Sequence, residues 1–149
     1  MTAPGCLSCQ QEEQTDLPPR ERVVVTAHWR VAHAFDSSLP GWLVVLPRRH
    51  LLSLSGLEPA AAAELGPLLA GLTRALEQVT GCVKTYVLLL AEAEGFAHLH
   101  LHVVPRMPDQ PASERGARVF ARLGRPEAER VPAAERDRLA LAVAAAVAW

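Results

Sequence analysis

The chain has 149 residues, half of them hydrophobic, so it is long enough for one domain with a buried core and short for two. The formal net charge is −1 and the basic residues are spread along the chain, which argues against a nucleic acid polymer as partner. The start has no secretory signal pattern, and no apolar run reaches the roughly 20 residues that span a bilayer. We therefore expect a cytoplasmic protein with no membrane partner.

The first 20 residues are predicted to be an irregular arm within a single domain that spans residues 1–149. This arm is polar and contains Cys6 and Cys9, which are separated by two residues, while a third cysteine, Cys82, stands alone. An odd number of cysteines at this spacing is unlike a secreted disulfide framework. In a reducing compartment, the Cys6 and Cys9 pair is typical of a metal site or of a redox pair.

Five segments have the composition of β-strands, and one long segment has the periodicity of a helix. Leucines recur every three or four residues from Pro59 to about Thr80, with Pro67 as a possible kink and Gly81 as a terminator. The predicted strands are residues 23–26, 29–35, 42–46, 85–90 and 98–105. Strand pairs without regular alternation with helices predict an α+β fold with a mostly antiparallel five-stranded sheet.

The last part of the chain is expected to differ from the strand-rich part. Residues 107–131 are charged and contain several prolines, so an irregular stretch is predicted there. Residues 132–149 are rich in alanine and leucine and are predicted to form a terminal helix. Of the other histidines, His28 and His33 are expected to be surface or half-buried positions in the first hairpin, and Trp42 is expected to pack in the core.

Three histidines alternate with apolar residues in the last predicted strand: His98, His100 and His102. Residues two apart on a strand point to the same face about 7 Å from one another, so the three imidazoles are expected to share one surface. Histidine is an ordinary choice for a nucleophile, a proton carrier or a metal ligand near neutral pH. This face is therefore the main candidate site.

The run from His98 to Val104 resembles the signature of the histidine-triad family, in which histidines alternate with hydrophobic residues. The resemblance extends to Phe35 and Asp36 and to the segment from Pro40 to His50, and it covers about residues 6–106. It implies a homodimeric α+β protein that hydrolyses or transfers nucleotides. The implied substrate is a purine nucleotide conjugate, either a dinucleoside polyphosphate or a nucleoside phosphoramidate.

The resemblance also implies roles for individual residues. His100 would attack the α-phosphate and form a nucleotidyl-histidine, and His102 would contact the phosphate oxygens. Asp36 would bond the ribose hydroxyls and Phe35 would form a wall for the base. A neutral imidazole held in one tautomer is a competent nucleophile towards phosphorus, so the implied role of His100 is chemically sound.

Some members of the family bind a structural zinc ion, and the matching positions in this chain are Cys6, Cys9, His50 and His98. Two thiolates and two imidazoles form a closed tetrahedral set, which is the type expected of structural zinc. Such a zinc ion would anchor the N-terminal arm beside the nucleophile.

The segment before the triad departs from the family pattern. Glu94 and Gly95 stand where many members have a Gln and a hydroxyl residue that contact the phosphates. A carboxylate beside a phosphate is repulsive unless it is protonated or faces a cation, so Glu94 is either a nucleotide-binding residue for a different substrate or a solvated loop charge. Two other functions stay open: a metalloenzyme in which all three triad histidines hold one ion, and a nucleotide-binding module with little catalysis.

Overall fold

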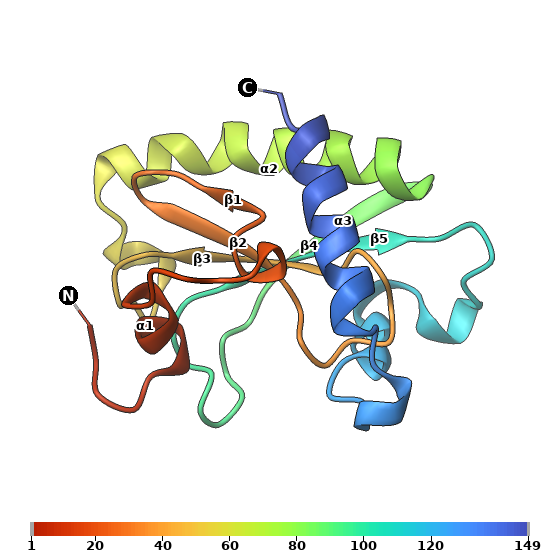
Figure 1. Cartoon of the computed structure of the whole chain (residues 1–149), viewed down its shortest axis with the longest axis horizontal. Coiled ribbons are helices and arrows are strands. Elements are labelled where there is room, and N and C mark those ends of the chain that lie inside the picture. Colours follow the sequence, from red (N-terminus) through yellow and green to blue (C-terminus); the bar gives the residue numbers. More distant parts are fainter. Residues whose placement is uncertain (1, 149) are drawn as a thin grey trace.

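The computed structural model describes residues 2–148 and has an α+β fold with one antiparallel sheet, as the sequence predicts (Figure 1). The strands follow one another in space as β1-β2-β3-β5-β4, and each neighbouring pair is antiparallel. The helices are α1 (Leu7–Glu12), α2 (Pro59–Thr80) and α3 (Ala133–Ala146), and the strands are β1 (Val24–Val25), β2 (Trp29–His33), β3 (Leu43–Pro47), β4 (Lys84–Leu89) and β5 (Leu101–Arg106).

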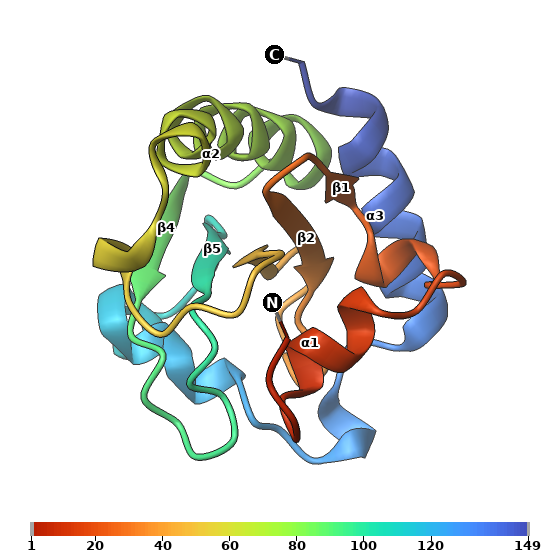
Figure 2. The same cartoon turned by 90° about the vertical axis from the view of Figure 1, so that its left-hand side faces the viewer.

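Helix α2 covers one face of the sheet (Figure 2). It begins with Pro59 in its first turn, where the missing N–H costs no helical bond, and it ends at Gly81, whose φ of 72° is left-handed. Pro67 lies inside the helix and does not split it. The leucines on its inner side pack on the strands in the main core. Among the helices of residues 2–148, α2 included, we find none with the length and apolar character needed to cross a membrane.

The face of the sheet opposite α2 carries the polar strand residues Arg30 and His102. Val31 and Val103 belong to the core under α2, so their strand neighbours Arg30 and His102 point to the opposite face. The β3 residue Val44 pairs with His102 and packs against a second, smaller apolar cluster on that face. Helix α1 and the segment after β5 lie on this side of the sheet (Figure 2).

The two segments predicted to be irregular both contain helical turns. The N-terminal arm forms α1 and a 3₁₀ turn at Pro19–Glu21. The segment after β5 forms 3₁₀ turns at Ala112–Glu114, Gly116–Arg122 and Glu127–Glu129. Local composition does not reveal these turns because residues distant in sequence hold them: Arg20 N–H, for example, donates to Asp137 at 2.9 Å.

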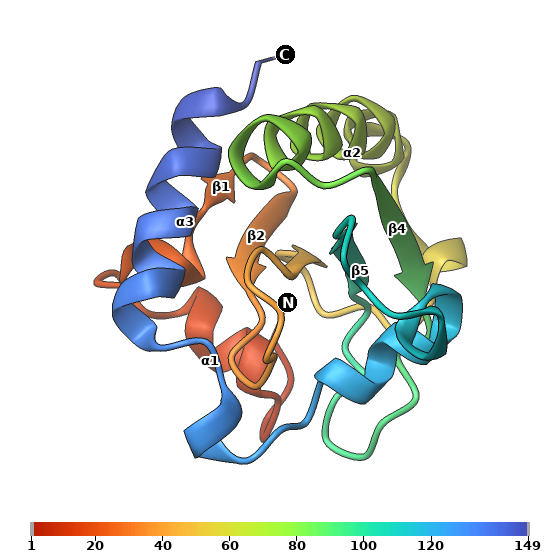
Figure 3. The same cartoon turned by 90° about the vertical axis from the view of Figure 1, so that its right-hand side faces the viewer.

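Helix α3 is shorter than predicted, since it begins at Ala133 and ends at Ala146. It packs on α2 and on the 3₁₀ turn of the arm, and its buried residues are Leu139, Ala140 and Val143 (Figure 3). The predicted part at Trp149 lies outside the described residues. The other elements agree with the predicted strands to within two residues at each end, except that the last strand begins at Leu101 instead of His98.

Candidate functional site

The three histidines of the triad do not share one surface, contrary to the expectation from strand periodicity. Strand β5 begins only at Leu101, so His98 and His100 lie in the segment that enters the strand. The rings of His100 and His102 lie edge to face with centroids 4.9 Å apart. The ring of His98 instead lies 5.1 Å from that of His50. The triad is therefore divided between two neighbouring groups of side chains.

The tautomer of His100 follows from its hydrogen bond. Its Nδ1 lies 2.8 Å from the carbonyl oxygen of His98. Because a carbonyl oxygen only accepts, Nδ1 carries the proton in the neutral ring, and Nε2 has a free lone pair. The ring is half-buried, so this lone pair belongs to a side chain that solvent and small ligands reach.

His102 has the opposite tautomer. The indole N–H of Trp42 donates to its Nδ1 at 2.9 Å. An indole nitrogen only donates, so Nδ1 of His102 is unprotonated and its Nε2 carries the proton. Burial, together with the neighbouring His100, lowers the pKa of His102 to about 4. At neutral pH, His102 is therefore a neutral donor held in one orientation.

The aromatic residues around His102 include two whose roles the sequence did not reveal. Trp42 is fully buried, as predicted, but it also makes the hydrogen bond to His102. Phe120, from the Gly116–Arg122 turn, lies edge to face against both rings, 5.1 Å from His102 and 5.6 Å from Trp42. An indole donor placed 60 residues before its acceptor leaves no local sequence signal.

The predicted metal ligands come together in space. One ligand atom from each of Cys6, Cys9, His50 and His98 lies within 4.8 Å of the others. The Nε2 of His98 is directed at the carbonyl oxygen of Pro47 at 2.9 Å, which leaves its Nδ1 unprotonated and facing Cys6 Sγ at 3.5 Å. Two thiols and two imidazoles are a donor set that could hold a metal ion.

The same geometry does not support one metal ion held by all three triad histidines. The unprotonated nitrogen of His98 faces the cysteines, whereas Nδ1 of His100 and Nδ1 of His102 are already hydrogen-bonded to a carbonyl group and to an indole. The unprotonated nitrogens therefore do not converge on one point.

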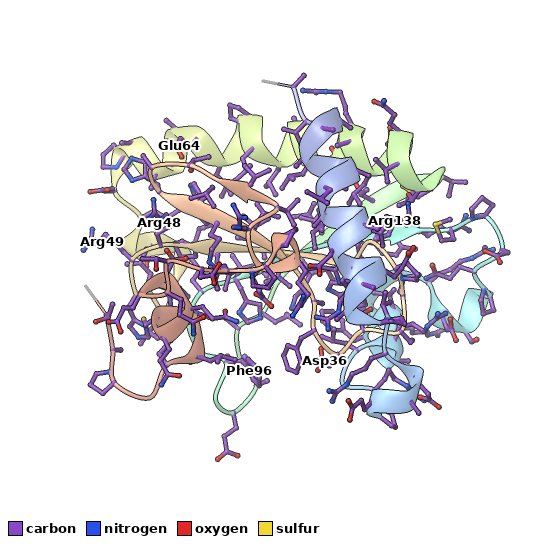
Figure 4. All side chains as sticks on the ribbon, viewed as in Figure 1. Asp36, Arg48, Arg49, Glu64, Phe96 and Arg138 are labelled. Atoms are coloured by element: carbon purple, nitrogen blue, oxygen red, sulfur yellow. The ribbon has the colours of Figure 1, made fainter. Side chains whose placement is uncertain are left out.

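The predicted nucleotide-binding residues lie on two loops beside the triad. Phe35 and Asp36 follow β2, and Asp36 O accepts a bond from Arg125 N–H at 3.0 Å. The ring of Phe35 is 43% exposed and nearly parallel to that of Phe96, with centroids 6.3 Å apart. Asp36 and Phe96 both lie on the side of the sheet away from α2 (Figure 4). Phe96 was not predicted as a site residue, and its only sequence signal is its place two residues before His98.

Glu94 and Gly95 are exposed in the loop that leads to His98. Gly95 has a φ of 82°, which is a conformation that favours glycine. On the other side of Phe35, the guanidinium carbon of Arg130 lies 5.6 Å from the ring centroid. Phe35 therefore contacts both the loop before His98, through Phe96, and the segment after β5, through Arg130.

His33 is buried, with 1% of its surface exposed, and not half-buried as predicted. Its Nδ1 donates to Ala34 O, and its Nε2 accepts from Gly41 N–H, both at 2.9 Å. Burial lowers the pKa of His33 to about 4. These bonds close the loop that carries Phe35 and Asp36, and a hairpin prediction could not show that the loop folds back on His33.

Comparisons with known proteins agree with this fold. A zinc-bound histidine triad family protein from Mycobacterium smegmatis superposes with a TM-score of 0.68 at 19% identity, covering 94% of this chain and 93% of that one. A histidine triad protein from Bradyrhizobium japonicum gives 0.69 at 21% identity, over 85% and 90%. A uridylyltransferase gives 0.65 at 22% identity and covers 95% of this chain but 44% of its own. A search of curated protein sequences finds no match.

At these identities, the solved structures establish a shared fold only. The HIT domain family, however, matches residues 18–109, which is more than half of the sequence. The matched region contains all five strands, α2 and the three histidines of the triad. The chain therefore belongs to the HIT domain family.

Proposed function

We propose that the chain is a nucleotide hydrolase or nucleotidyl transferase that acts at the α-phosphate of a purine nucleotide conjugate, with His100 as nucleophile. The observation that carries the proposal is the pair of opposite tautomers: an unprotonated Nε2 on His100 beside a protonated Nε2 on His102. A nucleophilic lone pair next to a fixed donor is what attack on a phosphate requires. The uridylyltransferase neighbour supports the transferase alternative.

In the first step, His100 Nε2 forms a bond to the α-phosphorus, and the bond from phosphorus to the leaving group breaks. The leaving group departs with that electron pair and is protonated by solvent. In the second step, water adds to phosphorus and loses a proton, and the bond to His100 breaks, which releases the nucleoside monophosphate. Transfer to another acceptor replaces water in this step. The His98 carbonyl stabilises the positive charge on the His100 ring while the intermediate lasts.

His102 contacts the phosphate oxygens in this proposal. Its Nε2–H is a donor that needs no reorientation during the reaction, because the Trp42 indole fixes the other nitrogen. Asp36 bonds the ribose hydroxyls, and Phe35 packs against the base. We assign Glu94 and Gly95 to the loop that the phosphates approach. The main-chain amide of Gly95 is the group that contacts a phosphate, because the exposed Glu94 carboxylate would repel it.

We further propose that Cys6, Cys9, His50 and His98 hold a structural zinc ion. The donor set fits, because two thiols and two imidazoles converge within 4.8 Å and the Nδ1 of His98 needs no deprotonation. Zinc would supply a crosslink among α1, the end of β3 and His98. We expect one zinc per chain in wild type, none in Cys9→Ser, and one in His100→Ala, by elemental analysis.

The test of the reaction is release of AMP from an AMP phosphoramidate and from diadenosine polyphosphates. Wild type should release AMP and carry a nucleotidyl group on His100 after an alkaline quench, which preserves a phosphorus–nitrogen bond. His100→Ala should do neither. Equal release by His100→Ala would exclude His100 as nucleophile. Tight nucleotide binding without release would favour a binding module instead.

A homodimer is also part of this proposal. β4 forms one edge of the sheet; Val87 within it is 45% exposed, and Val83 just before it is 51% exposed. An exposed apolar edge strand is suited to pair with another chain. Sedimentation velocity will test the dimer directly.

A further inference from the structure

The sheet contains a buried positive charge that the proposed reaction does not use. Arg30 projects from β2 on the face opposite α2, and its side chain is 2% exposed. Within the described residues, its side-chain hydrogen bonds all go to the N-terminal arm: to Glu12 Oε1 at 2.5 Å, to Glu21 O at 2.7 Å and to Gln11 Oε1 at 3.2 Å. The arm therefore both covers this guanidinium and supplies its partners, and an arm that closed without the Glu12 carboxylate would leave a buried charge short of an acceptor, which is a costly state.

The second oxygen of the same Glu12 carboxylate reaches another part of the chain. Glu12 Oε2 accepts a hydrogen bond from Arg48 Nε at 3.1 Å. Arg48 lies just after β3, two residues before His50, and Figure 4 places it above α1. Its guanidinium also donates to Thr26 O at 3.0 Å, so it is itself held in place. The Glu12 carboxylate therefore bridges β2 and the segment that carries a proposed metal ligand.

Glu12 is the last residue of α1, Cys9 lies within this short helix, and Cys6 directly precedes it. Cys9 is three residues earlier and 1% exposed, and Cys6 is the residue that caps the N-terminus of the helix. A helix of six residues is unstable on its own, so its position depends on contacts with the rest of the protein. Fixing Glu12 at one end of so short a helix also fixes where the thiols lie.

We propose that Glu12, Arg30 and Arg48 form a latch that places Cys6 and Cys9 against His50 and His98 before any metal binds. Glu12 is a positioning residue for the metal cluster, and the arm is held by ion pairs as well as by metal. This inference builds on the zinc part of the proposed function and is independent of the reaction. Its first test requires no metal and no substrate.

The first test measures the reaction of each cysteine with a thiol probe in metal-free protein, with the three cysteines resolved by peptide mass spectrometry. Glu12→Gln removes the charge of the latch but keeps one acceptor. The matched control is Glu13→Gln, an exposed neighbour whose substitution removes the same charge from the same arm. Cys82, buried elsewhere in the core, reports on opening of the whole fold.

We expect Cys9 to react about tenfold faster in Glu12→Gln than in wild type, because a charge-assisted hydrogen bond is lost from the closed arm. Glu13→Gln should accelerate Cys9 far less than Glu12→Gln, because the charge of Glu13 is only the weakest of the causes that raise the pKa of Cys9. The rate at Cys82 should be the same in all three proteins. Equal rates at Cys9 in the three proteins would overturn the proposal. Parallel acceleration at Cys9 and Cys82 would also overturn it, because the effect would then be global unfolding.

The second test measures zinc affinity by competition with a chelator at a temperature where all variants are folded. A loss of global stability alone does not change this affinity, whereas an open arm lowers it in proportion to the closed fraction. Glu12→Gln should bind zinc more weakly than Glu13→Gln, and Arg48→Gln should fall between them. Equal affinities would overturn the assignment of the latch to the metal cluster. Both readouts stand even if His100 forms no nucleotidyl intermediate.

Discussion

His33 makes the stability of this fold sensitive to acid. Its Nε2 accepts a hydrogen bond from the Gly41 N–H, so a proton at this nitrogen would place two donors face to face in a buried site. Burial lowers its pKa from the ordinary 6.5 to about 4, although the bond to Ala34 O opposes the shift. The stabilisation is complete above pH 6.5, where neither state binds the proton, and it is lost as the pH falls towards 4.

The magnitude follows from the size of the shift. At about 1.36 kcal/mol for each pKa unit, a fall from 6.5 to about 4 corresponds to about 3 kcal/mol of unfolding free energy. His102 is shifted in the same direction and also destabilises the wild-type fold at low pH. The contribution of His33 must therefore be obtained as a difference between two proteins that both contain His102.

The assay is urea unfolding of metal-free wild type and His33→Gln at pH 7, 6, 5 and 4. Gln is expected to lower the stability at pH 7, because it cannot reproduce both hydrogen bonds of the ring. The free energy of unfolding of wild type minus that of His33→Gln should then fall by about 3 kcal/mol from pH 7 to pH 4, since only wild type loses the neutral His33. A difference in free energy of unfolding that does not change with pH would refute this account of His33.

Three further predictions concern the site and the assembly. Trp42→Phe should lower kcat/KM about tenfold through loss of the hydrogen bond that fixes His102. The control is Trp29→Phe, which removes an indole that bonds to a carbonyl of α2 and should leave kcat/KM within about twofold of wild type. Equal effects of the two substitutions would exclude a specific role of the Trp42 bond. Phe96→Ala should raise KM about fivefold at constant kcat if the base packs on the exposed ring pair; a change in kcat alone would place Phe96 elsewhere in the reaction. Val87→Asp should convert a dimer to a monomer in sedimentation velocity, and a dimeric variant would exclude the β4 edge as the interface.

Regular elements and short motifs were predictable from the sequence. The leucine period defined α2, with Pro59 and Gly81 at its ends, and the family resemblance brought the four metal-cluster residues into one group. These features depend on local spacing or on a pattern shared by many chains. The fold class and the family were predicted correctly for the same reason.

Features set by contacts between distant residues were not predictable. Strand periodicity predicts that His98 lies on the same face as His100. In the structure, the His98 ring is directed at Pro47 and the cysteines, and the strand begins three residues later, at Leu101. The arm composition is typical of irregular chain, yet the arm is ordered by Arg30, whose charge has no local partner on β2. In both cases, a buried polar group determines the local conformation by its need for a partner.

The His98 residue connects the two halves of the site through different atoms. Its ring belongs to the metal cluster, whereas the group that orients His100 is its main-chain carbonyl. Any amino acid at this position other than one that distorts the backbone supplies the same carbonyl. Substitution at position 98 would therefore alter the proposed metal site while the acceptor for the His100 ring is retained, so the two proposed properties can change separately during divergence or in protein engineering.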